Sequence, residues 1–157
     1  MKKFFALVAA LLLIATASPA AFAASSSSSK SASASAQMVK LVNRERQRYG
    51  RSALQVDAKL TKAAQAKANE MVAKRYLSHT SPAYGNLQSL LKKFNIRYTA
   101  AGENVAYYGS VQRAHVGLMA SSGHRNNILN ARYNKVGIGV AFDQYGYVRI
   151  CQLFTRS

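Results

Sequence analysis

Apolar residues recur at helical spacing where the folded part of the chain begins. Between residues 37 and 49 they repeat every three or four positions: Met38, Leu41, Val42 and Tyr49. This spacing is typical of an amphipathic helix with one face in the core. We expect Gly50 to end this helix as a C-terminal cap. The arginines of the segment are expected to lie largely on its solvent side: Arg44, Arg46 and Arg48.

Three further segments have helical patterns. Asp57 is a suitable N-cap for a helix over residues 58–76, whose buried face is rich in alanine. Leucines at helical spacing predict a short helix over residues 86–95. Ser110 is expected to cap a fourth helix, which Gly123 would terminate just before His124.

The remaining pattern predicts strands. Residues 100–107 form one candidate strand, and the apolar runs 136–142 and 147–154 flank the turn residues 143–146. Two apolar runs around such a turn are typical of a β-hairpin. Because helices precede and interrupt the strands, the order predicts an α+β fold with a small antiparallel sheet covered by helices.

The first 36 residues differ in composition from the rest. Lys2 and Lys3 precede an apolar run, and Ala21-Phe22-Ala23 resembles a cleavage site, so residues 1–23 are predicted to be a secretory signal peptide. We expect no transmembrane anchor after cleavage. Residues 24–36 are almost entirely serine and alanine, which predicts a flexible tether. The folded domain is then expected to span residues 37–157.

The chain is strongly basic. It has 22 Lys and Arg residues against five Asp and Glu, a net charge of +17, and loss of the signal peptide would leave about +15. Such a charge attracts polyanions. We therefore expect anionic envelope polymers or lipids as partners and nucleic acid only nonspecifically. We also expect the protein to be secreted and monomeric. Cys151 is the only cysteine, which excludes an internal disulfide, and its apolar neighbours predict a buried strand position.

Rare residue types mark the candidate site. With only five acidic residues and three histidines in the chain, each one is informative. Glu103 lies in Gly102-Glu103-Asn104, His124 lies in Gly123-His124-Arg125, and His79 lies in a turn-like Ser-His-Thr-Ser-Pro segment. Our hypothesis is that His79, Glu103 and His124 converge on one site.

These segments together resemble the CAP superfamily, which comprises cysteine-rich secretory proteins, antigen 5 and pathogenesis-related proteins, and in particular its secreted bacterial branch. The segments that carry the resemblance occur in the family's order over residues 37–157: Leu41–Arg46, Ser78–Pro82, Gly102–Ala106, Ser122–Leu129 and Val136–Val140. The resemblance implies a three-layer α-β-α sandwich with an open cleft.

The resemblance also implies roles for individual residues. His79, Glu103 and His124 match three of the four residues that line the cleft in many members, while the second glutamate has no counterpart. Two imidazoles and a carboxylate suit zinc or another divalent metal, which makes the three residues a candidate metal set. Without metal they would form a polar cluster. Asn104, Arg125 and Asn127 are expected to support the site by bracing the turn around His124.

The sequence leaves three functions open. The preferred hypothesis is a non-enzymatic binding module at or outside the cell envelope, because of the signal peptide, the basic charge and the missing acid. The alternative is a metal-dependent hydrolase, for example a protease, that uses His79, Glu103 and His124. A weaker alternative is a lipid or sterol binder with an apolar groove between helices.

Overall fold

The protein, described here by a computed structural model, is resolved over residues 19–157. Its elements in chain order are α1 (Pro19–Arg48), β1 (Gln55–Val56), α2 (Ala58–Ala73), α3 (Leu87–Lys93), β2 (Ala100–Tyr108), α4 (Val111–Ala120), α5 (Ser122–Leu129), β3 (Lys135–Phe142) and β4 (Val148–Arg156). The signal peptide predicted over residues 1–23 lies mostly outside this range and stays a prediction. None of the helices within residues 19–157 combines the length and apolar composition needed to cross a membrane.

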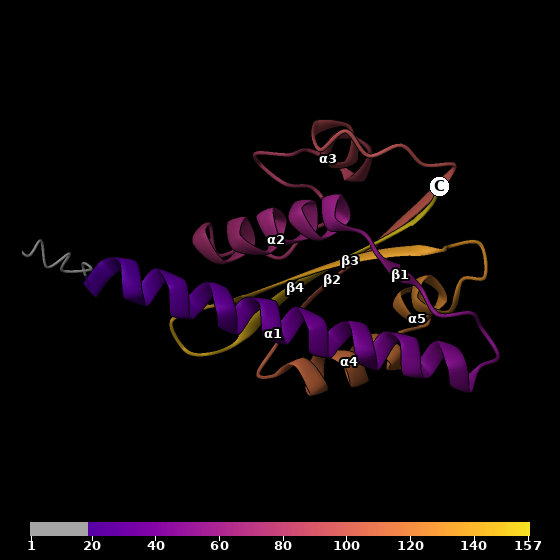
Figure 1. Ribbon diagram of the computed structural model, residues 1–157, viewed down its shortest axis with the longest axis horizontal. Helices are drawn as coiled ribbons and strands as arrows, with labels where there is room; N and C mark the ends of the chain where they lie inside the picture. The colour runs from indigo at the N-terminus through magenta and orange to yellow at the C-terminus, as the bar shows by residue number, and fades with distance from the viewer. Residues whose placement is uncertain (1–18) are drawn as a thin grey trace, which may run out of the picture.

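The strands form one sheet between two helical layers, as Figure 1 shows. The strand order is β1-β3-β4-β2, with β4 antiparallel to both of its neighbours. Helices α2 and α3 cover one face, and α1, α4 and α5 cover the other. Successive residues of β4 serve opposite layers, since Ile150 packs with α1 and α4 whereas Cys151 packs with α2 and α3. The predicted α+β three-layer fold is confirmed, but β1 pairs with β3 in parallel, so the sheet is mixed.

Several helix boundaries follow from the caps read in the sequence. Asp57 accepts a hydrogen bond from the amide of Leu60 at 3.0 Å, and Ser110 accepts one from Arg113 at 3.2 Å. Such caps satisfy amides that have no partner inside the helix. The prediction that Gly123 ends the fourth helix is wrong, because α4 ends at Ala120 and Gly123 lies inside α5.

Residues 24–36, expected as a flexible tether, are helical and continue α1. Ala34 and Ser35 are buried, and Ala34 shares a core cluster with Met38 and Ile138. Alanine is a strong helix former, and extending an existing helix avoids the cost of nucleation. The packed domain therefore begins before Gln37.

Arg46 is buried rather than on the solvent side of α1, contrary to the sequence prediction. Its residue surface is 1% exposed. The guanidinium donates to the carbonyl oxygens of Ser52, Ile128 and Asn130 at 2.8, 2.8 and 2.9 Å. Burial, and after it the charge of Arg51, lower the pKa of Arg46. The arginine thus satisfies carbonyls at the end of α5 and fixes α5 against α1.

Candidate functional site

The structure brings His79 and Glu103 into direct contact. Glu103 lies in the centre of β2, and its side chain is only 3% exposed. Its Oε1 is 2.8 Å from Nδ1 of His79, which lies in the segment after α2. The His79 side chain remains 62% exposed. A buried carboxylate therefore orients an imidazole that faces solvent.

A residue that the sequence analysis missed, Lys67 of α2, completes this contact. Its side chain is fully buried, and Nζ lies 2.6 Å from Oε2 of Glu103. The same ammonium donates to the backbone carbonyl of His79 at 2.6 Å. Its position on the apolar stripe of α2, between Ala64 and Met71, was the available signal. A lysine on the buried face of a helix requires a buried partner.

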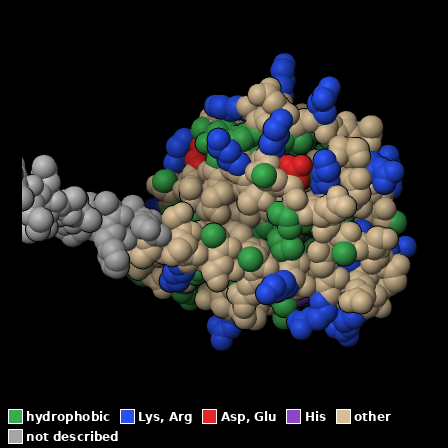
Figure 2. All heavy atoms as spheres, in the orientation of Figure 1, with side chains coloured by type: hydrophobic (Ala, Val, Ile, Leu, Met, Phe, Trp, Pro, Cys, Tyr) green, Lys and Arg blue, Asp and Glu red, His purple; other side chains and the backbone are tan. Residues whose placement is uncertain are grey.

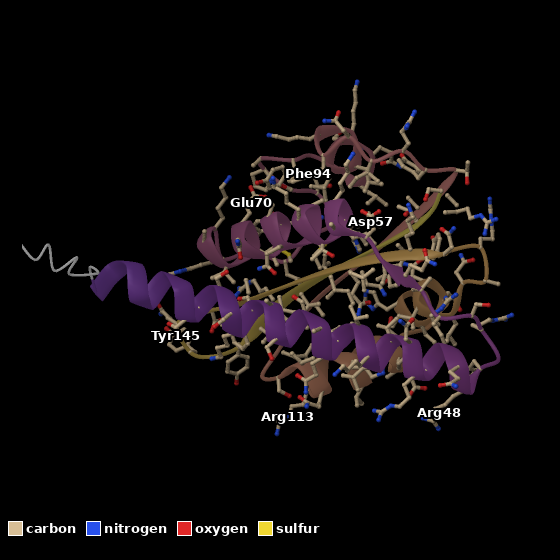
Figure 3. All side chains as sticks on the ribbon, in the orientation of Figure 1. Arg48, Asp57, Glu70, Phe94, Arg113 and Tyr145 are labelled. Carbon is tan, nitrogen blue, oxygen red and sulfur yellow. The ribbon has the colours of Figure 1, made fainter. Side chains whose placement is uncertain are left out.

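Glu70, one turn further along α2, fixes the segment that carries His79 (Figure 3). Its carboxylate accepts from the Ser81 hydroxyl, from the Ala83 amide at 2.9 Å and from the Tyr76 hydroxyl at 2.9 Å. Burial alone would raise the pKa of Glu70, but these hydrogen bonds and the one from Lys74 outweigh it and lower the pKa to about 2. Glu70 is therefore charged near neutral pH and anchors the loop after α2.

Of the three predicted supporting residues, Asn104 and Asn127 connect the strand of Glu103 to α5. Asn127 donates from Nδ2 to the carbonyl of Glu103 at 3.1 Å and to Oδ1 of Asn104 at 2.9 Å. Asn104 in turn donates to the carbonyl of His124 at 3.1 Å. Arg125 donates to the carbonyl of Met119 at 3.2 Å, which braces the junction of α4 and α5.

His124 lies near this cluster, but its backbone rather than its ring joins the hydrogen bonds just described. Burial, and after it the charge of His79, lower the pKa of His124. The two histidines are therefore close enough to interact electrostatically, and His124 is favoured in its neutral form.

The arrangement does not fit the metal set that the sequence suggested. Both oxygens of Glu103 are engaged, one by the Lys67 ammonium and the other by His79. A divalent cation at Glu103 would lie beside a buried positive charge, which low dielectric makes costly. Within residues 19–157, no group of three or more His, Cys, Asp or Glu side chains is placed to hold a metal. The charge that a metal would supply at Glu103 is supplied by Lys67.

Cys151 is not a reactive partner of this cluster. Its thiol is 3.8 Å from Oε2 of Glu103 and fully buried. Burial, and after it the charge of Glu103, raise the pKa of Cys151 well above its usual value. The thiol therefore stays protonated, as expected for a structural cysteine.

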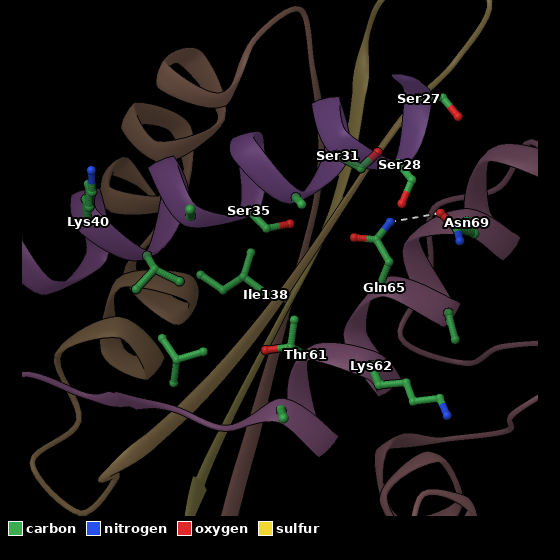
Figure 4. Close-up of a pocket in the computed structure, with 16 residues that line it drawn as sticks. Ser27, Ser28, Ser31, Ser35, Lys40, Thr61, Lys62, Gln65, Asn69 and Ile138 are labelled. Carbon is green, nitrogen blue, oxygen red and sulfur yellow. Dashed lines mark hydrogen bonds between the residues drawn. The ribbon is translucent and has the colours of Figure 1, made fainter. Parts of the chain in front are cut away.

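A groove of about 1120 Å³ lies elsewhere, between α1 and α2 over Ile138 of β3 (Figure 4). None of His79, Glu103 and His124 lines it. Most of the groove's surface is apolar, although several lining residues carry hydroxyl or amide groups, and Gln65 there bonds Asn69 at 2.9 Å and both backbone groups of Val140. The mainly apolar surface is compatible with the lipid or sterol hypothesis, which stays a prediction.

The three-layer α+β sandwich is the fold of a CAP domain. Residues 39–154 match the family described as "CAP: Cysteine-rich secretory protein family". The chain belongs to this family.

Relatives by sequence come from Bacillus subtilis (strain 168). The chain is 42% identical over 104 residues to the uncharacterized protein YkwD. The matched region covers 66% of this chain and 40% of YkwD. It is 34% identical over 105 residues to the uncharacterized membrane protein YlbC, covering 66% of this chain and 30% of YlbC. The chain thus spans two fifths or less of the length of these relatives.

Solved structures share the fold. An extracellular protein containing an SCP domain from Bacillus anthracis str. Ames superposes with a TM-score of 0.76 at 27% identity, covering 90% of this chain and 45% of that protein. A cysteine-rich secretory protein of Staphylococcus aureus superposes with a TM-score of 0.66 at 21% identity, covering 81% of this chain and 40% of that one. The second likeness concerns the fold alone.

Proposed function

We propose that this chain is a secreted, non-enzymatic CAP module that binds anionic polymers of the cell envelope. The observation that carries the proposal is the state of its acidic residues. All five are ion-paired: Glu45 with Arg48 at 3.0 Å, Asp57 with Lys135 at 3.5 Å, Glu70 with Lys74 at 2.9 Å, Glu103 with Lys67 at 2.6 Å and Asp143 with Arg149 at 3.4 Å. Every carboxylate is thereby neutralised within the protein.

The exposed basic side chains that have no carboxylate partner are consequently available to partners. Against the five carboxylates the chain has 22 Lys and Arg residues. Figure 2 shows lysine and arginine side chains around the visible face, with few acidic ones between them. A surface of one sign raises the local concentration of polyanions. The extracellular description of the Bacillus anthracis relative supports a location at or outside the envelope.

Salt-dependent binding to isolated envelopes tests the proposal. We expect the purified protein to co-sediment with cell walls that carry phosphate polymers at about 0.01 M salt, and to be released at about 1 M salt, because the Debye length falls from about 30 to about 3 Å. Walls stripped of phosphate polymers and vesicles of anionic phospholipid distinguish a wall polymer from lipid headgroups. Failure to bind any of these at every ionic strength would contradict the proposal.

A hydrolase is the second candidate, and one observation favours it. Glu103 holds Nδ1 of His79 at 2.8 Å while the side chain stays 62% exposed, so the other ring nitrogen is available as a general base. Because Lys67 is ion-paired with Glu103, this observation supports a metal-free hydrolase rather than a metal-dependent one.

Turnover assays separate the two candidates. We expect no hydrolysis of peptide or ester substrates and no zinc binding by calorimetry in the wild-type protein. Zinc binding or turnover that disappears in the His79→Ala/His124→Ala variant would replace the binding proposal by a hydrolase. The same variant should still bind cell walls, because the wall contacts are assigned to the basic surface.

A further inference from the structure

Exposed tyrosines gather at the end of the molecule where the β3–β4 turn meets the end of β2. Tyr145 and Tyr147 of the turn are 76% and 46% exposed, and Tyr107 of β2 is 38% exposed. Figure 3 shows Tyr145 on this turn, at the opposite end of the molecule from Arg48. Exposed aromatic side chains grouped in this way mark interaction surfaces.

The rings of Tyr107 and Tyr147 are held in place by their neighbours. The centroids of Tyr107 and Tyr147 lie 5.5 Å apart with the planes inclined by 36°. The Arg149 guanidinium lies 4.1 Å from the Tyr107 centroid, and the Tyr107 hydroxyl donates to Asp143 at 2.8 Å. Oδ1 of Asp143 also accepts from the amides of Tyr145 and Tyr147, both at 3.0 Å. Little conformational entropy would be lost when the side chains of Tyr107 and Tyr147 contact a partner.

Gly109 lies between the Tyr147 ring and the Arg113 guanidinium. A Cβ atom added there would lie 3.7 Å from the Tyr147 ring and 3.7 Å from Nη1 of Arg113. Arg113 is exposed, and no carboxylate within residues 19–157 forms an ion pair with it. Tyr107, Tyr145, Tyr147 and Arg113 around Gly109 are called the tyrosine–arginine patch below.

The charge of the patch is positive and comes from one group. Asp143 is neutralised by Arg149 at 3.4 Å and by the Tyr107 hydroxyl. Arg113 is therefore the cation that is available to a partner. Its planar guanidinium binds carboxylate and phosphate groups with two parallel hydrogen bonds.

We propose that the tyrosine–arginine patch binds an anionic glycan in which charged sugars alternate with uncharged ones. Apolar faces of the sugar rings pack on Tyr145 and Tyr147, the hydroxyls of these two tyrosines bond sugar hydroxyls, and Arg113 pairs with the acidic group of a neighbouring sugar. This inference rests on the proposed function, since it specifies the anionic envelope polymer and the surface that recognises it.

The composition of the patch favours a glycan over a single-stranded nucleic acid. A nucleic acid carries a charge on every nucleotide and is bound in grooves lined with several cations. The patch offers three exposed rings and one available cation. The 36° inclination between Tyr107 and Tyr147 also prevents both rings from continuing one stack of parallel bases.

Binding of a defined probe by a patch variant tests the inference. Hyaluronan oligosaccharides alternate a carboxylate sugar with a neutral one, and dextran of equal length and single-stranded oligothymidine serve as comparison probes. We expect Tyr145→Ser/Arg113→Gln to weaken hyaluronan binding by about ten-fold at about 0.15 M salt, as removal of an aromatic contact and a charged pair implies. The matched control is Tyr49→Ser/Arg51→Gln, which removes the same groups at the far end of α1.

Each outcome decides a different point. Equal loss in the patch and control variants, or dextran binding as tight as hyaluronan binding, overturns the patch assignment and leaves the proposed function intact. Tighter binding of oligothymidine that is lost in the patch variant assigns the patch to nucleic acid and overturns the glycan. If the wild-type protein binds neither hyaluronan nor cell walls, the proposed function fails as well.

Discussion

Replacing Lys67 by methionine is expected to lower the free energy of unfolding by about 3–5 kcal/mol, the usual effect of breaking one side of a buried ion pair. The Lys67 side chain is fully buried, and the Glu103 side chain is 3% exposed. Methionine fills most of the same volume but leaves a buried carboxylate without its cation. It also removes the donor that holds the His79 carbonyl at 2.6 Å. Urea unfolding followed by circular dichroism measures the loss.

Two comparisons isolate the ion pair from simple loss of packing. Lys67→Met/Glu103→Gln removes both charges and is expected to recover part of the stability, because the cost comes from the unpaired carboxylate. Lys62→Met, on the exposed side of the same helix, should change stability by no more than about 0.5 kcal/mol. If Lys67→Met had the same urea unfolding midpoint as the wild-type protein, the buried ion pair would not form.

Lys67 and Arg46 show what sequence periodicity cannot resolve. Both are basic residues of amphipathic helices, and the pattern alone favours solvent for such residues. Their burial depends on partners far along the chain, Glu103 in one case and the carbonyls of Ile128 and Asn130 in the other. A pattern read within one helix contains no information about those partners. Lys67 at least lies on the apolar stripe of α2, so its position signalled burial.

Elements set by local chemistry were predicted well. Asp57 and Ser110 cap the helices as expected, and Gly146 adopts the positive φ of 81° that the β3–β4 turn requires. The helical state of residues 24–36 was missed because it depends on continuation of α1 and on packing of Ala34 in the core, neither of which the composition of the segment shows. The parallel β1 strand was missed because its two residues carry no periodicity.

The candidate site was predicted in part. Rarity of acidic and histidine residues directed attention to His79 and Glu103, which the structure places 2.8 Å apart. The asparagines near Glu103 and His124 link the two segments through hydrogen bonds. The metal hypothesis considered only possible ligands, whereas the structure adds a competing cation, Lys67. Suitable ligand residues in a sequence therefore do not establish a metal site, because a buried cation such as Lys67 can already occupy the carboxylate.

Gly137→Ala is expected to destabilise the protein by about 3 kcal/mol or more, at the upper end of overpacking effects. A Cβ atom added to Gly137 would lie 2.1 Å from the backbone carbon of Leu60 and 2.3 Å from the Thr61 nitrogen. These are backbone atoms of α2, so no side-chain rotation can relieve the contact. Since α2 carries Lys67 and Glu70, its displacement from β3 should also disturb the His79 segment.

Gly123→Ala provides the matched control for this substitution. Gly123 lies inside α5, and nothing approaches within 4 Å of an added Cβ atom. Alanine is favoured over glycine inside a helix, so this variant should be more stable than wild type by about 0.5–1 kcal/mol. Urea unfolding of both variants measures the contrast. Equal midpoints for Gly137→Ala and wild type would contradict the close contact of α2 with β3, on which the geometry of the Lys67–Glu103–His79 cluster depends.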